Sequence, residues 1–152
     1  MLSIRFALWA ATAGALIPVM AALNSRLGQA LGEPLHAPVV LFVVGLIACA
    51  IVSILMAGSP PDFSRLTTAR PVEFSGGLIV GFYVISATLL APRFGVGNFI
   101  LFAVAAQIIC SALIDHFGLF GAVIRPVNFV RLGGIALLLA GLVITQISTA
   151  RT

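Results

Sequence analysis

Hydrophobic positions form five long, nearly continuous runs along the chain, separated by short polar segments. A helix that crosses a bilayer needs about 20 mostly apolar residues, and continuous runs of this length favour helices over half-buried strands. Lipid offers the backbone no hydrogen-bonding partner, which also favours helices because they satisfy their own peptide groups. We predict spanning helices at approximately 6–31, 36–57, 73–91, 96–116 and 130–148.

The polar segments between the runs carry helix-breaking residues. They are 32–34, 58–71 with two consecutive prolines, a tight turn at 92–95, and 118–131. Because runs and connectors account for nearly the whole chain, nothing is left for a water-soluble domain. The pattern therefore predicts an all-α, polytopic integral membrane protein in which residues 1–152 form a single five-helix transmembrane domain.

Composition agrees with this interpretation. Of the 152 residues, 61% are hydrophobic and 8% are charged, whereas soluble domains carry about 25% charged residues. This excludes a soluble enzyme and a disordered or nucleic-acid-binding chain. The basic residues are all arginines, scattered singly, and are typical of anchors at a membrane edge. Cys49 and Cys110 lie within apolar runs, so we expect buried, reduced thiols, and no His/Cys cluster predicts a metal site.

The arginines also indicate the orientation in the membrane. With the N-terminus inside, five arginines lie on the cytoplasmic side and three on the other. The five are Arg5, Arg65, Arg70, Arg125 and Arg131, and the three are Arg26, Arg93 and Arg151. The N-inside orientation is favoured only weakly, and so small a bias also fits a chain that inserts both ways. The first apolar run continues well past the small residues 11–13, so we expect a retained helix rather than a cleaved signal peptide.

Polar side chains within the apolar runs are functional candidates, because placing them in hydrocarbon is costly. Gln107, Ser111 and Asp115 are spaced four apart, which places them along one slightly winding helix ridge. Gln107 faces either a cavity or another helix. Asp115 either handles a proton or cation, or pairs at the helix end with His116 or an arginine.

The first and third runs hold further candidates. The carboxamide of Asn24 can bind a solute or a neighbouring helix, and Pro18 predicts a kink six residues before it. Tyr83 lines a solute cavity or serves as an aromatic packing residue. Gly77 and Gly81 form a GxxxG pair, which favours close approach of two helices. Asn98 is expected to cap the N-terminus of the fourth helix, and Glu73 suits the first turn of the third.

These motifs together resemble a known family. The chain combines Pro18 and Asn24, Gly77 and Gly81, Gln107, the run Asp115-His116-Phe117-Gly118, and Arg131 with Gly134 and Gly141. This pattern resembles the short YdcZ-like branch of the drug/metabolite transporter superfamily, related to the small multidrug-resistance transporters. The resemblance implies a transporter in the bacterial inner membrane, with Gly134 and Gly141 as further helix-packing positions.

Two departures limit what the resemblance implies. Met20 stands where the family usually has a glutamine, and no acid lies in 6–23, where the multidrug exporters carry a glutamate. A drug-for-proton antiport mechanism therefore does not carry over. Larger superfamily members resemble two five-helix halves of opposite orientation, which implies that a single five-helix chain pairs with an inverted second copy.

The sequence thus predicts a membrane transporter that moves a small polar or amphipathic solute by alternating access as a homodimer, with an antiparallel pair favoured. The expected solute-binding residues are Asn24, Tyr83, Gln107, Ser111 and Asp115. No cofactor, metal or nucleic acid is expected. The sequence shows no pattern of a nucleophile with a base, so an enzyme is not expected either. The alternatives are a non-transporting scaffold or accessory subunit that binds a partner through its glycine-lined helices, and a passive channel.

Overall fold

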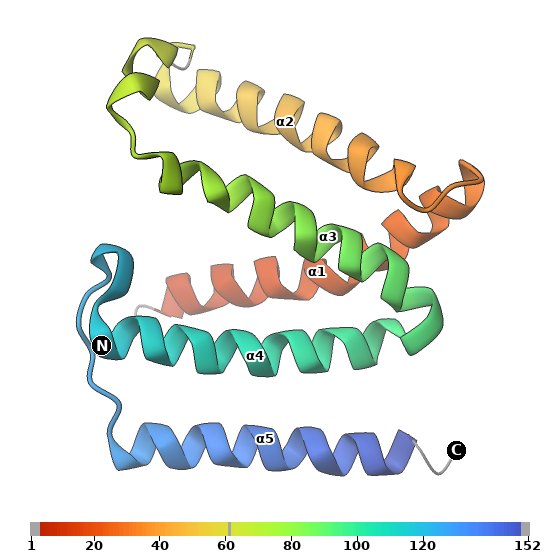
Figure 1. Cartoon of the computed structure of the whole chain (residues 1–152), viewed down its shortest axis with the longest axis vertical. Coiled ribbons are helices and arrows are strands. Elements are labelled where there is room, and N and C mark those ends of the chain that lie inside the picture. The colour runs from red at the N-terminus through yellow and green to blue at the C-terminus, as the bar shows by residue number, and fades with distance from the viewer. Residues whose placement is uncertain (1–3, 61, 150–152) are drawn as a thin grey trace. The chain divides into compact units, whose positions relative to one another are not determined.

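The computed structural model of the chain describes residues 4–60 and 62–149 and contains five long helices (Figure 1). They are α1 (Ile4–Ala30), α2 (His36–Ala57), α3 (Ser75–Phe94), α4 (Val96–Phe117) and α5 (Phe129–Thr149), with short 3-10 helices η1 (Phe63–Thr68), η2 (Pro71–Phe74) and η3 (Leu119–Gly121). The described residues include no strand. All five α-helices are long and apolar enough to cross a membrane, which confirms the predicted all-α, five-span class.

The chain divides into two compact units, one ending at Val96 and the other beginning at Gly97. In the first unit, α1 packs most extensively against α3, and α2 contacts both. The buried residues of α1 and α3 are mostly small: Ala21, Asn24 and Gly28 on α1, and Val84, Ala87, Thr88 and Ala91 on α3. Small side chains let the two backbones approach closely, as is common between membrane helices.

The third helix extends beyond its expected end at residue 91. α3 continues through Pro92 to Phe94, and the expected tight turn at 92–95 is therefore wrong. Pro92 forfeits its own backbone N–H bond, but its fixed φ is compatible with a helix. Gly95 ends α3 instead: its φ is 90° and its N–H donates to the carbonyl of Ala91 at 3.0 Å. A positive φ of this kind is accessible to glycine at little cost.

In the second unit, α4 and α5 lie side by side and antiparallel, joined by residues 118–128, which we call the connector (Figure 1). Side-chain hydrogen bonds tie the two helices together at both ends, between Asn98 and Gln146 at one and between Asp115 and Arg131 at the other. No described residue of α5 is buried.

Most side chains of the five spans are exposed within the single chain. Only 0–22% of the residues in each span are buried. The expectation of buried thiols is wrong, because Cys49 and Cys110 are both exposed. In a membrane an apolar run does not imply burial in a protein core, since lipid tails solvate an outward-facing side chain as well as a protein interior does.

Candidate functional site

Asn24 lies at the contact between α1 and α3 and is 4% exposed. Its Nδ2 donates to Oγ1 of Thr88 on α3 at 2.5 Å. Thr88 is 1% exposed, and its hydroxyl donates in turn to the carbonyl of Val84 at 2.8 Å. The three groups form one hydrogen-bonded chain across the helix pair. Sequence reasoning missed Thr88, although a threonine within an apolar run was the signal available.

Asn24 also lines an open pocket of about 440 Å³ on the face of α1 next to α2. The other lining residues are Met20, Leu23, Leu27, Val40, Leu41, Val44 and Gly45. Asn24 is therefore the only side chain with a hydrogen-bonding amide in an otherwise apolar wall. Met20 contributes a thioether to this wall and adds no second amide. The pocket suits a molecule with an apolar body and one polar group.

Asn24 keeps hydrogen-bonding capacity after it binds Thr88. A carboxamide has two N–H donors and a carbonyl acceptor, and the bond to Thr88 uses one donor. Among the described residues, no buried side-chain oxygen or nitrogen lacks a partner. The Oδ1 atom, for which the described chain supplies no bond, must therefore be accessible.

The structure does not test the roles expected for the other two candidates of the first unit, Tyr83 and Pro18. Tyr83 lies on α3, half-buried, and takes part in an interaction within the chain. Pro18 lies within α1, which continues without interruption from Ile4 to Ala30. The roles expected for Tyr83 in solute binding and for Pro18 as a kink stay predictions.

Gln107 lies at the middle of α4, which runs unbroken from Val96 to Phe117. Its side chain is exposed and forms no hydrogen bond with any described residue. Ser111, one turn further, is also exposed, and its hydroxyl donates to the carbonyl of Ile108 at 2.9 Å. Along this part of α4, therefore, the carboxamide of Gln107 has all its donors and its acceptor available for a further partner.

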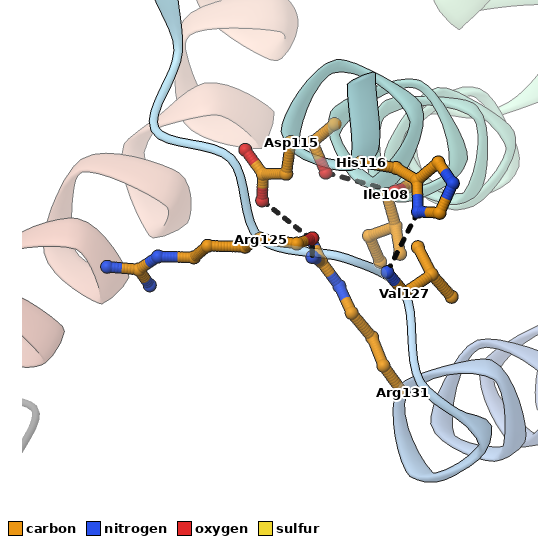
Figure 2. Close-up of polar contacts among 7 residues, drawn as sticks. Ile108, Asp115, His116, Arg125, Val127 and Arg131 are labelled. Carbon is orange, nitrogen blue, oxygen red and sulfur yellow. Dashed lines mark hydrogen bonds and ion pairs between the residues drawn. The ribbon is translucent and has the colours of Figure 1, made fainter. Parts of the chain in front are cut away.

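Asp115, at the end of the same ridge, forms an ion pair with an arginine (Figure 2). Its Oδ2 lies 2.7 Å from Nη2 of Arg131, and the two side chains are 34% and 33% exposed. The Nη1 group of Arg131 also donates to the carbonyl of Arg125 at 3.4 Å. This is the pairing that the alternative interpretation of Asp115 describes, and its role toward a solute stays a prediction.

Two further hydrogen bonds attach the connector to the end of α4 (Figure 2). The backbone N–H of Arg125 donates to the carbonyl of Asp115 at 2.8 Å, and that of Val127 donates to Nδ1 of His116 at 3.0 Å. Oδ1 of Asn128 then accepts from the N–H of Arg131 at 2.8 Å, in the manner of a helix N-cap.

The opposite end of this helix pair corrects one expectation. Asn98 is the third residue of α4 rather than its cap, because the helix already begins at Val96. Oδ1 of Asn98 instead accepts from Nε2 of Gln146 on α5 at 3.0 Å. A contact over 48 positions cannot be recognised from local capping patterns.

The expected helix-packing glycines contact nothing within the described chain. A methyl group added at Gly77, Gly81, Gly134 or Gly141 would meet no atom within 4 Å. The close approach is found instead at Gly28, where such a methyl would lie 2.9 Å from Cα of Pro34. The packing roles expected for these four glycines therefore stay predictions.

Outside the spans, the segment between α2 and α3 contains a perturbed acid. The hydroxyl and the backbone N–H of Ser64 both donate to Oδ1 of Asp62, at 2.6 Å and 3.0 Å. These bonds favour the ionised form and lower the pKa of the Asp62 carboxyl below its ordinary value.

Among the described residues, no group of three His, Cys, Asp or Glu could hold a metal ion.

Comparisons with known proteins identify the family. No curated protein and no solved structure matches the chain significantly. The family described as "Putative inner membrane exporter, YdcZ" matches residues 5–144, nearly the whole chain. That match covers α2, α3 and α4, all of α1 except its first residue, and most of α5, and it confirms the resemblance drawn from the motifs. The chain therefore belongs to the YdcZ family of inner-membrane exporters, which is of the drug/metabolite transporter type.

Proposed function

We propose that this multi-pass inner-membrane protein exports a small amphipathic solute by alternating access, as an antiparallel homodimer. The observation that carries the proposal is Gln107, an exposed carboxamide at the middle of a spanning helix that has no hydrogen bond to any described residue. Moving an amide from water to an apolar medium without a partner costs roughly 2–7 kcal/mol. A pathway for a polar solute, completed by a second copy, offers Gln107 the partners that lipid does not.

Asn24 supports the amphipathic character of the solute. It is one amide in an apolar pocket of about 440 Å³, and it retains a donor and an acceptor beyond its bond to Thr88. The apolar wall would bind the body of the solute, and the carboxamide would orient its polar group. Small-molecule sites commonly combine an apolar lining with a few placed polar groups.

The near balance of arginines supports opposite insertion of the two copies. Five arginines against three is too small a bias to fix one orientation firmly. A two-fold pair is also the simplest closed assembly, and inverted repeats around a site near the midplane are common in transporters. In such a pair the two Gln107 side chains would approach the same pathway from opposite directions.

The test is solute flux into liposomes that contain the purified chain, with Gln107→Ala, Asp115→Asn and a control variant, Thr12→Val. Thr12 is exposed, and among the described residues its hydroxyl bonds only within its own helix, to the carbonyl of Leu8 at 2.9 Å. We expect Gln107→Ala to lower flux at least tenfold while cross-linking still detects the dimer, and Thr12→Val to leave flux unchanged. Equal flux in Gln107→Ala and the wild type would refute the proposal.

A scaffold or accessory subunit is the second candidate, favoured by the open space beside Gly77 and Gly81. That function predicts the reverse pattern of variants. Gly77→Leu or Gly81→Leu would abolish partner binding, whereas Gln107→Ala and Asp115→Asn would leave it intact. Measuring dimerisation and flux on the same four variants separates the two functions.

A further inference from the structure

His116 occupies a position from which it can hold or release the connector. It is the next-to-last residue of α4, its side chain is exposed, and its Nδ1 accepts the backbone N–H of Val127 at 3.0 Å (Figure 2). The ring also makes an edge contact with Phe117, with the centroids 4.7 Å apart. Figure 2 shows the imidazole turned toward Val127, on the side of α4 away from the carboxylate of Asp115.

This hydrogen bond depends on the protonation state of the imidazole. A neutral imidazole has one N–H donor and one acceptor nitrogen, whereas both nitrogens of the protonated ring are donors. Because a backbone N–H can only donate, it can bind Nδ1 only while that nitrogen carries no proton. Protonation of Nδ1 therefore breaks this bond, and histidine is in general the side chain that changes charge most readily near neutral pH.

The charged groups around His116 do not provide a substitute acceptor. Asp115, its neighbour on α4, is engaged by Arg131 of α5, and the connector contributes Arg125. Both arginine side chains carry only donors, and Figure 2 shows the guanidinium of Arg125 directed away from the imidazole. His116 also borders an apolar pocket of about 330 Å³ with Val127 and residues of α4 and α5, and this lining offers the ring no other hydrogen-bonding side chain.

We propose that His116 is a proton-sensitive clasp, which holds the connector against α4 through Val127 while the imidazole is neutral and releases it on protonation. The remaining attachments, from Arg125 N–H to the carbonyl of Asp115 and from Arg131 to its carboxylate, do not require a neutral imidazole. Release therefore frees the backbone N–H of Val127, the residue before Asn128, close to the point where the chain enters α5. The clasp does not depend on the identity of the solute.

Amide-resolved hydrogen–deuterium exchange of the full chain in lipid nanodiscs tests this proposal, with rates corrected for the intrinsic pH dependence of exchange. We expect the protection of the Val127 amide to fall at least tenfold from pH 8 to pH 5. His116→Asn offers an acceptor oxygen near the place of Nδ1 that does not titrate, so its Val127 protection should change less than twofold. His116→Leu offers no acceptor and should leave Val127 poorly protected at both pH values.

His36 provides the matched control, because it is the other histidine of the chain and lies at the start of α2. His36→Asn should retain the pH response of the wild type. The proposal is overturned if wild-type protection at Val127 is the same at both pH values, or if His116→Asn responds to pH as strongly as the wild type. It is equally overturned if His36→Asn abolishes the response.

Discussion

Replacing Thr88 with valine tests the buried contact between α1 and α3. Valine keeps the branched shape of threonine but replaces the hydroxyl with a methyl group, so that Nδ2 of Asn24 loses its acceptor. Both residues are almost fully buried, at 1% exposure for Thr88 and 4% for Asn24. Thr88→Val should therefore destabilise the helix pair without creating a cavity.

The structure sets the size of this effect. A buried polar group left without a partner costs about 1–3 kcal/mol, whereas interhelical hydrogen bonds in membrane proteins average about 0.6 kcal/mol and reach about 1.7 in double-mutant cycles. We expect Thr88→Val to lower the free energy of unfolding by about 1–3 kcal/mol. In a cycle with Asn24→Leu, the coupling between the two positions should be about 0.6–1.7 kcal/mol.

Equilibrium unfolding in mixed micelles, followed by circular dichroism, measures both quantities. Thr12→Val is the control, since Thr12 makes the same kind of bond to a carbonyl four residues earlier but is exposed and has no partner on another helix among the described residues. It should change stability by less than 0.5 kcal/mol, as surface substitutions usually do. Equal effects of Thr88→Val and Thr12→Val, or zero coupling to Asn24, would refute the reasoning.

Two further predictions concern other parts of the first unit. Gly28→Ala should destabilise the chain by about 1–3 kcal/mol, because the added methyl would lie 2.9 Å from Cα of Pro34. Gly14→Ala is the control for the same unfolding assay. Its added methyl would meet no atom within 4 Å, so this variant should be neutral or stabilising. Ser64→Ala should raise the pKa of Asp62 toward its ordinary value of 3.8, as measured by carbon NMR titration. Since the native bonds lower that pKa, their contribution to stability is full above 3.8 and is lost as the pH falls through the folded value. Equal stability of Gly28→Ala and Gly14→Ala would contradict the first prediction, and an unchanged pKa of Asp62 in Ser64→Ala would contradict the second.

The five-span class was accessible from the sequence because lipid imposes a strong and simple rule. Each span needs an apolar run of a certain length, and that signal does not depend on neighbouring helices. The ends of the helices were harder to predict where two local rules competed. Pro92 suggested an earlier end for α3, but the positive φ of Gly95 is the feature that ends it.

Side-chain partnerships were the part that the sequence could not specify. Asn24 and Gln107 are both carboxamides in apolar runs, yet Asn24 is buried against Thr88, whereas Gln107 is exposed and has no bond to a described residue. The difference comes from which face of each helix meets its neighbour, and nearly continuous apolar runs leave that face unmarked. The same ambiguity explains why Gly28 is a site of close approach among the described residues, whereas Gly77 and Gly81 are not.

The concentration dependence of solute flux in liposomes tests the central claim most directly, namely that the chain binds a solute during transport. With a panel of small amphipathic cations, neutral molecules and anions, we expect flux above that of protein-free liposomes for at least one class, saturating as the concentration rises. Flux that increases linearly without saturation, or flux equal to that of protein-free liposomes for every class, would contradict the account.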